Sequence, residues 1–199
     1  LAKTLFLTQN LIVGMKSLFI DREIKYTGRE LSPHWIYKNF HIQGDAIVAF
    51  AGEVEVNIGE MVDIEDVINN EPIYSKKMLN FIIERFGVSL DEMIWCQRLF
   101  VSIIKEALEK RGINLQRSGD DLFFKGKKLS VSIATKSITS SLVHTALNII
   151  GEGAPIEVSS LNELGIENIE ELAKDIMNAF CAECESISMA KSKVRGVVE

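Results

Sequence analysis

Apolar residues recur at helical spacing along two long stretches of the chain. In Leu90–Arg111 they follow one another at intervals of three and four residues, so they share one face of a predicted helix. Ser89 and Glu92 form a capping box at its start, and Gly112 ends it. A second apolar stripe predicts a C-terminal helix over Asn168–Met189, with its first residue as the cap.

Elsewhere the pattern changes to shorter segments. Pro33–Phe40, with Ser32 as cap, predicts a short helix, and Ser75–Phe86 predicts a further helix. Six segments are typical of strands: Lys16–Tyr26, Asp45–Val56, Ile113–Gln116, Leu122–Phe124, Lys128–Thr135 and Leu142–Ile149. This order predicts an α+β fold, a mostly antiparallel sheet with helices packed mainly on one face. No repeat or linker interrupts it, so residues 1–199 are expected to form a single domain.

The most informative segment is DLFFKGKKLSVS, residues 121–132, in which a basic Gly turn joins two short apolar runs. Because successive strand residues face opposite sides of a sheet, its second half has two faces. They are an apolar face of Leu129, Val131 and Ile133 and a polar face of Lys128, Ser130 and Ser132. We expect the polar face to border a pocket or solvent, with both serines as candidate binding residues.

This segment resembles the catalytic core of the biotin and lipoate protein ligases and of the octanoyl transferases. SSLVHTALNI (residues 140–149) and VSSLNELGI (residues 158–166) resemble the segments that follow it in those families, in the same order. Over almost the full chain the sequence is similar to an uncharacterised prokaryotic family of unknown function that shares their fold. The resemblance implies a biotin/lipoate protein ligase-like, class II synthetase-like sheet.

The resemblance also implies a site. Lys128 corresponds to the ligase lysine that contacts the acyl carbonyl, where a fixed ammonium stabilises developing negative charge. Lys127 is its outward neighbour, Asp121 matches the aspartate of the ligases' acidic pair, and Asp120 stands where they usually have asparagine. The residues alone leave an alternative to each of these roles. The lysines can belong to a solvated basic turn, and the aspartates can cap the backbone of a turn.

Five other side chains are candidates for binding. Arg117 can grip a carboxylate or phosphate, or merely be solvated at the surface. His144 shares strand parity with Asn148 and can bond substrate, although a lone histidine is more often structural. Arg29 and Trp35 can wall a pocket, with a helix's core contact as the alternative for the tryptophan. Asp45 is a candidate only because of its position at the start of a strand.

The sequence departs from the resembling families in two places. No Gly-rich, Arg-containing signature of the RRxSGGG type precedes the long helix, so no cofactor is assigned. Where the octanoyl transferases carry a nucleophilic cysteine, this chain reads GEGAPIEV, which excludes a thioester intermediate of that kind. Val131 also replaces a glycine, which we expect to narrow the pocket.

The cysteines and histidines predict no structural metal. Cys181 and Cys184 have the CxxC spacing of half a zinc site or a redox pair, but no second pair or nearby histidine completes four ligands. Because they fall within a helical pattern, buried helix cysteines are the favoured interpretation. His34 and His41 offer no metal-binding spacing either.

Composition limits the partners. The net charge is -6 and the basic residues are scattered, so nucleic acid is not an expected partner. No apolar run approaches the ~20 residues that cross a bilayer, and the first residues lack a leader pattern, so a cytoplasmic location is expected. The leading hypothesis is an enzyme acting on a small-molecule carboxylate or acyl compound. The alternatives are a noncatalytic ligand-binding or regulatory module and a structural homodimer formed through a sheet edge.

Overall fold

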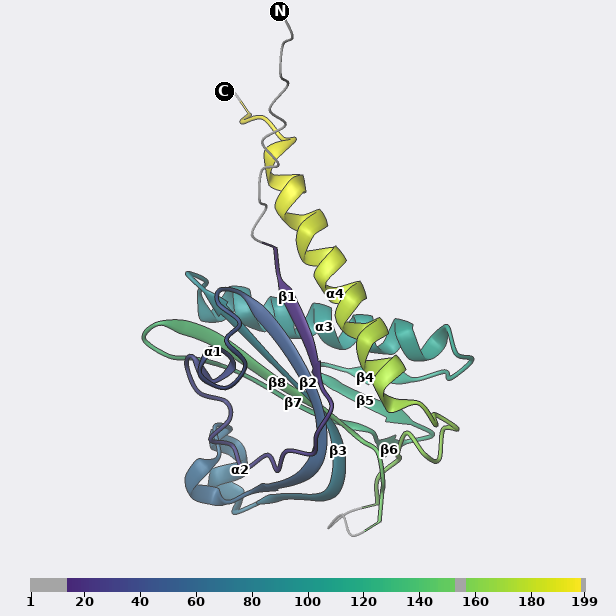
Figure 1. Cartoon of the computed structure of the whole chain (residues 1–199). Coiled ribbons are helices and arrows are strands. Elements are labelled where there is room, and N and C mark those ends of the chain that lie inside the picture. The colour runs from purple at the N-terminus through teal and green to yellow at the C-terminus, as the bar shows by residue number, and fades with distance from the viewer. Residues whose placement is uncertain (1–13, 153–156, 198–199) are drawn as a thin grey trace, which may run out of the picture.

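A computed structural model describes residues 14–152 and 157–197. Its main feature is a five-stranded sheet (Figure 1). The strands lie in the order β1 (Lys16–Ile20), β2 (Ala46–Val56), β3 (Ile73–Phe86), β8 (Ser140–Asn148) and β7 (Ser130–Lys136). β1 is parallel to β2, and all other neighbours are antiparallel. The predicted α+β fold with a mostly antiparallel sheet is therefore confirmed, and β1 and β7 are its edges.

A small second sheet carries the basic turn. It is formed by β4 (Gln116–Ser118), β5 (Asp121–Phe124) and β6 (Lys127–Lys128). Lys125 and Gly126 connect β5 to β6 with φ angles of 49° and 82°, which is why a glycine is needed in this hairpin. The strand predicted at Ile113–Gln116 lies further along the chain, because Ile113 and Leu115 are buried core residues of the preceding loop.

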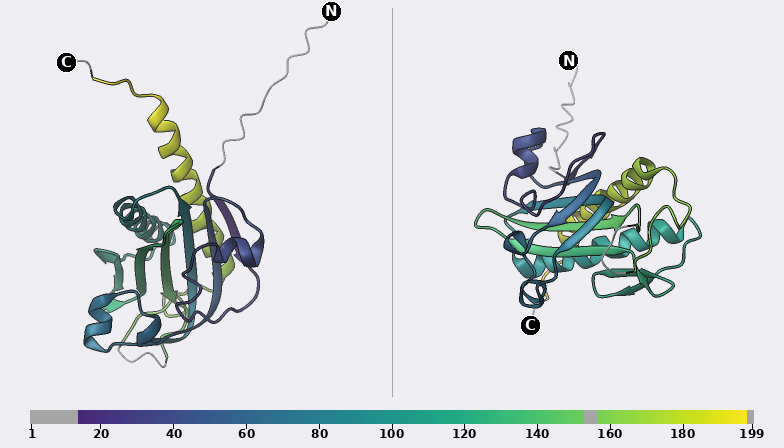
Figure 2. Two further views of the ribbon diagram at one scale, coloured as in Figure 1. Left: turned by 90° about the vertical axis from the view of Figure 1, so that its left-hand side faces the viewer. Right: turned by 90° about the horizontal axis from the view of Figure 1, so that it is seen from below.

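Two long helices cover one face of the main sheet, as predicted. They are α3 (Leu90–Glu109) and α4 (Ile169–Ser192). The capping box of α3 is confirmed, and the Asn168 side chain caps α4 by accepting from the backbone N–H of Glu171 at 3.0 Å. Only the first half of α4 is buried, and the second half extends past the sheet (Figures 1 and 2). None of the described helices has both the length and the apolarity needed to span a membrane.

The opposite side of the sheet carries shorter elements. They are α1 (Trp35–Phe40), the 3-10 turn η1 (Ile58–Glu60) and α2 (Ile64–Asn69). The N-cap of α1 is His34, in a left-handed conformation, so the prediction that Ser32 caps this helix is wrong. α2 was not predicted because it buries none of its residues and therefore shows no apolar stripe.

The predicted helix at Ser75–Phe86 is also wrong, because this segment forms most of β3. β3 lies at the centre of the sheet, between β2 and β8. Leu79, Phe81 and Ile83 pack toward α3 and α4, whereas Met78 and Ile82 pack into the apolar cluster on the other face. A strand buried on both faces loses the alternation that distinguishes it from a buried helix.

The core consists of two apolar clusters, one on each face of the sheet. The chain changes faces at Leu129, between β6 and β7. Leu129 belongs to the helix-side cluster, whereas Val131 and Ile133 pack against the opposite cluster. The prediction that these three share one face is therefore wrong, because a break between two strands resets the alternation.

Candidate functional site

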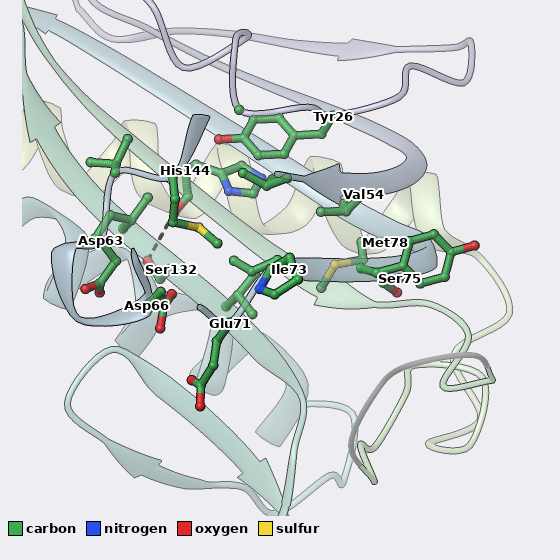
Figure 3. Close-up of a pocket in the computed structure, with 18 of the residues that line it drawn as sticks. Tyr26, Val54, Asp63, Asp66, Glu71, Ile73, Ser75, Met78, Ser132 and His144 are labelled. Carbon is green, nitrogen blue, oxygen red and sulfur yellow. Dashed lines mark hydrogen bonds between the residues drawn. The ribbon is translucent and has the colours of Figure 1, made fainter. Parts of the chain in front are cut away.

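A cavity of about 730 Å³ lies on the face of the sheet opposite α3 and α4 (Figure 3). Its walls come from the Tyr26 loop, from β2, β3, β7 and β8, from the η1–α2 segment, and from the basic hairpin. Segments far apart in the sequence thus meet at one concave surface. A volume of this size is in the usual range for small-molecule sites.

Apolar side chains line much of the cavity. They are Val54, Val56, Met61, Val62, Ile73, Met78, Val131, Ile133 and Val158. Val131 is one of these lining residues. It is the residue that was expected to narrow the pocket because it replaces a glycine. These groups favour the apolar body of a ligand, since its burial removes nonpolar surface from water.

His144 and Tyr26 form a stacked pair in the same wall. Their ring centroids are 3.7 Å apart with an interplanar angle of 11° (Figure 3). Nε2 of His144 lies 3.0 Å from Oδ1 of Asn80, whose amide nitrogen donates to the carbonyl of Met78. Because Oδ1 can only accept, Nε2 carries the proton. Burial lowers the pKa of His144 to about 3, so the ring is neutral at physiological pH.

Lys128 borders the cavity next to Asp121. Its Nζ lies 3.0 Å from the carboxylate Oδ1 of Asp121, and both side chains are about one-third exposed. An ion pair this exposed contributes little to stability, so its main physical effect is to hold the ammonium in one place.

Asp120, Ser130 and Ser132 also line the cavity, but their polar atoms already have partners. Asp120 accepts from Arg98 at 2.7 Å and from Gln97 at 2.9 Å. The Ser130 hydroxyl accepts from the backbone N–H of β5 at 2.9 Å. The Ser132 hydroxyl contacts Gln97 and Thr145. The contacts of Asp120 and Ser130 attach the hairpin to α3 and β7 and thereby position Lys128.

The wall formed by α2 is acidic. Asp63, Asp66 and Glu71 line the cavity here (Figure 3). Partial burial, followed by the nearby charges of Asp63 and Glu71, raises the pKa of Asp66, while Lys128 acts in the opposite direction. Among the lining residues of the described chain there are six acidic side chains, and Lys128 is the one Lys or Arg.

The other five predicted site residues lie outside this lining. Arg117 donates to the carbonyl of Gly119, and Lys127 pairs with Glu157 at 2.7 Å. The other three have structural contacts: Arg29 with Glu60, Trp35 with Phe40 and Phe50, and Asp45 with Arg85 and the backbone N–H of Phe86. Their binding roles stay predictions.

Sequence reasoning missed several lining residues, chiefly Tyr26, Asp63, Asp66, Glu71, Ser75 and Met78. One polar residue behind the lining could have been recognised from the sequence. Asn80 interrupts the apolar run MLNFII, and an amide inside such a run requires a buried partner. That partner is His144.

The cysteines lie away from the cavity lining. Cys96 is in α3, and Cys181 and Cys184 are in α4, as expected from the helical pattern. Burial raises the pKa of each thiol, in the case of Cys184 to about 12, which opposes formation of a reactive thiolate. Within residues 14–152 and 157–197, no cluster of three or more His, Cys, Asp or Glu side chains is arranged to hold a metal ion.

The sequence matches the family described as Domain of unknown function (DUF366) over residues 15–195. The chain belongs to the DUF366 family. A relative at the sequence level is the uncharacterized protein MJ0805 of Methanocaldococcus jannaschii. The two are 38% identical over 179 residues, which cover 87% of this chain and 81% of the relative.

Solved structures agree with this family and with the predicted fold. A protein of unknown function from Pyrococcus horikoshi has a TM-score of 0.88 and 35% identity, over 93% of this chain and all of its own. The biotin protein ligase from Aquifex aeolicus in complex with biotin and ATP has a TM-score of 0.60 and 13% identity, over 86% of this chain and 71% of its own. Protein Ta0514 from T. acidophilum, with bound lipoic acid, has a TM-score of 0.60 and 14% identity, over 87% of this chain and 86% of its own. This DUF366 protein therefore has a biotin/lipoate ligase-like fold.

Proposed function

We propose that this protein binds a small molecule that has an apolar body and a carboxyl or acyl group placed at Lys128. The observation that carries the proposal is the ammonium of Lys128, held 3.0 Å from Asp121 at the border of a largely apolar cavity. The fold supports it, since structural neighbours were solved with biotin and with lipoic acid.

The chemistry follows from the placement of the ammonium. Nζ of Lys128 attracts a carboxylate, or the oxygen of an acyl group as negative charge develops on it during transfer. The ion pair with Asp121 holds the ammonium in place, and its N–H groups can donate to a ligand. The apolar groups around the cavity exclude water from the ligand's body, which strengthens the attraction at the charged end.

A nucleoside triphosphate does not fit this lining. Three of its six carboxylates have ionic partners, and the other three, Asp63, Asp66 and Glu71, have none among the described residues and repel a polyanion, so we derive no step through ATP. The same observation favours, as the second candidate function, a binding module that does not catalyse ligation. Incubating the protein with ATP and octanoate separates a ligase from a noncatalytic binding module. Release of pyrophosphate that depends on Lys128 would support a ligase, and we expect no such release.

Octanoate binding measured by calorimetry tests the proposal. K128M removes the ammonium and should weaken octanoate binding about tenfold or more, the scale of one charge-assisted hydrogen bond. K127M is the matched control, because Lys127 pairs with Glu157 outside the lining and its loss should change affinity less than about twofold. Equal effects of the two substitutions would contradict the proposal.

A further inference from the structure

One buried histidine in the cavity wall has a ring nitrogen without a partner. Four polar residues of the lining are more than nine-tenths buried: Ser75, Ser130, His144 and Asn148. The hydroxyl of Ser75 donates to Oδ1 of Asn148, whose amide nitrogen donates to a backbone carbonyl. The hydroxyl of Ser130 accepts from a backbone N–H of β5. Of the nitrogen and oxygen atoms in these four side chains, Nδ1 of His144 is the one with no partner among the described residues.

The surroundings of His144 direct this nitrogen into the cavity. Nε2 lies 3.0 Å from Oδ1 of Asn80, a residue behind the lining, so that edge of the ring points away from the cavity. Tyr26 covers one face of the ring, with 3.7 Å between the ring centroids (Figure 3). No fully buried side-chain nitrogen or oxygen of the described chain lacks a partner, so Nδ1 reaches open space. The open space that His144 borders is the cavity.

The tautomer of His144 determines which ligand group fits here. Because the Nε2–H donates to Asn80, Nδ1 carries a lone pair and can only accept a hydrogen bond. A ligand whose apolar body covers Nδ1 without donating to it leaves a buried acceptor unsatisfied, which weakens binding. The Tyr26 hydroxyl both donates and accepts, so it selects neither kind of group. The wall therefore favours a ligand with a hydrogen-bond donor at His144.

The register of the sheet sets the distance between this donor and Lys128. The backbone N–H of Asn148 donates to the carbonyl of Leu129, the residue next to Lys128. His144 is four residues away from Asn148 along β8, which at about 3.3 Å per residue is roughly 13 Å. The Lys128 side chain covers part of that distance, and a chain of several carbons spans the rest. Because both side chains line one cavity, a single ligand can contact both.

We propose that the ligand is a medium-chain carboxylic acid, or an acyl derivative of one, with an uncharged hydroxyl group that donates to Nδ1 of His144. A hydroxyl supplies the donor and adds no charge. An ammonium would need an anionic partner at the ring, whereas the ring's partners, Asn80 and Tyr26, are both uncharged. The carboxyl end lies at Lys128, so the inference rests on the proposed function.

Calorimetry with three probes tests the inference: octanoate, 8-hydroxyoctanoate and 8-methoxyoctanoate. The full chain should bind 8-hydroxyoctanoate about fivefold or more tightly than octanoate, the scale of one neutral hydrogen bond. The methoxy acid keeps the oxygen but has no O–H, so it should bind no better than octanoate. The same comparison with six-carbon and ten-carbon acids shows whether the hydroxyl is bound at a fixed place, since the preference should then be greatest at one length.

A double variant removes the histidine without leaving a buried polar group unpaired. N80L/H144F replaces both partners of the Nε2 hydrogen bond with apolar groups of similar size, which is close to neutral for folding. It should bind octanoate about as well as the unmodified protein and lose the preference for 8-hydroxyoctanoate. H41N is the matched control, because His41 is exposed and lies outside the lining, and it should keep the preference.

The nitrogen-15 NMR signal of Nδ1 gives a second readout on the unmodified protein. Bound 8-hydroxyoctanoate should move this signal to lower frequency, because the nitrogen accepts a hydrogen bond, and bound octanoate should not. This measurement decides the case even if the double variant does not fold. An Nδ1 signal that stays in place with 8-hydroxyoctanoate bound overturns the inference.

The remaining outcomes distinguish the inference from the proposed function. Binding that is lost in K128M but shows no hydroxyl preference at any chain length overturns the hydroxyl site and leaves the proposed function standing. A hydroxyl preference that N80L/H144F abolishes, with binding unchanged in K128M, supports the hydroxyl site and overturns the proposed function. A methoxy acid that binds as tightly as the hydroxy acid, or an equal preference at all three lengths, overturns the inference. Failure of every acid to bind overturns both.

Discussion

At the scale of single residues, the site depends on polar groups placed inside apolar strands. His144 lies on β8 and Asn80 on β3, and both face the cavity side of the sheet. The sequence predicted that His144 has the same strand parity as Asn148. The structure confirms this, since both line the cavity, whereas Val143 packs toward the helices. Whether His144 contacts a ligand stays a prediction.

The neutral state of His144 predicts a specific pH dependence of stability. Its folded pKa is about 3, while an unfolded histidine titrates near 6.5. At a pH between these values only the unfolded chain binds the proton. The neutral His144 ring therefore makes its full contribution to folding stability above about pH 6.5, and this contribution decreases as the pH is lowered. We expect a contribution of about 1.4 kcal/mol per pH unit to the slope of the unfolding free energy.

Urea unfolding of H144Q at pH 7, 6 and 5 measures this contribution. The variant should be less stable at pH 7 but show a flatter dependence below it. H41N is the control, because His41 is exposed and has a left-handed backbone conformation that asparagine tolerates. An unchanged slope in H144Q would show that another group causes the acid sensitivity.

Local sequence reasoning found part of the site for a physical reason. Lys128 and Asp121 belong to one hairpin, so their spacing along the chain already brings them together. Asp66, Glu71 and Tyr26 reach the same cavity from segments far away in the sequence. No local pattern records such a meeting, because it depends on how the chain folds back over the sheet.

At the scale of elements, the reliability of a pattern depended on which surfaces each element buries. α3 buries one face and ends in clear caps, so its apolar stripe predicted it well. β3 buries both faces over its central residues, so its composition resembled a helix. α2 buries no residue and gave no pattern, yet it supplies the acidic wall.

The capping box of α3 predicts a measurable loss of stability. The Ser89 hydroxyl accepts from the backbone N–H of Glu92 at 3.2 Å, and the Glu92 carboxylate accepts from the backbone N–H of Ser89 at 2.7 Å. S89A should lower the free energy of unfolding by about 1 kcal/mol in urea titrations. S186A, at an exposed position in α4, should change it by less than about 0.5 kcal/mol. Equal effects would mean that the cap does not stabilise the helix.

At the scale of the whole molecule, a single sheet separates two apolar clusters. The helix-side cluster holds α3 and α4, and the other holds the Tyr26 loop and α1. β2, β3 and β8 contribute buried residues to both clusters. Because one set of strands serves both, we expect the clusters to form and unfold together, which is also what the predicted single domain requires.

The two tryptophans allow this cooperativity to be tested. Trp35 packs against the cavity-side cluster, whereas Trp95 is 76% exposed on α3. In W95F the remaining fluorescence therefore reports on the cavity side, while far-ultraviolet circular dichroism reports mainly on the long helices. The two signals should give the same urea midpoint. Separate midpoints would mean that the two sides of the sheet unfold independently.

The sequence by itself determined the α+β class, the long helices with their caps, and the basic hairpin that carries Lys128. These features depend on neighbouring residues, whose spacing sets which side chains share a face. Only the tertiary structure decided that Ser75–Phe86 is a central strand and that the face of the sheet changes at Leu129. It also placed the α2 carboxylates at the cavity, because long-range packing, which local periodicity does not encode, brings distant segments together.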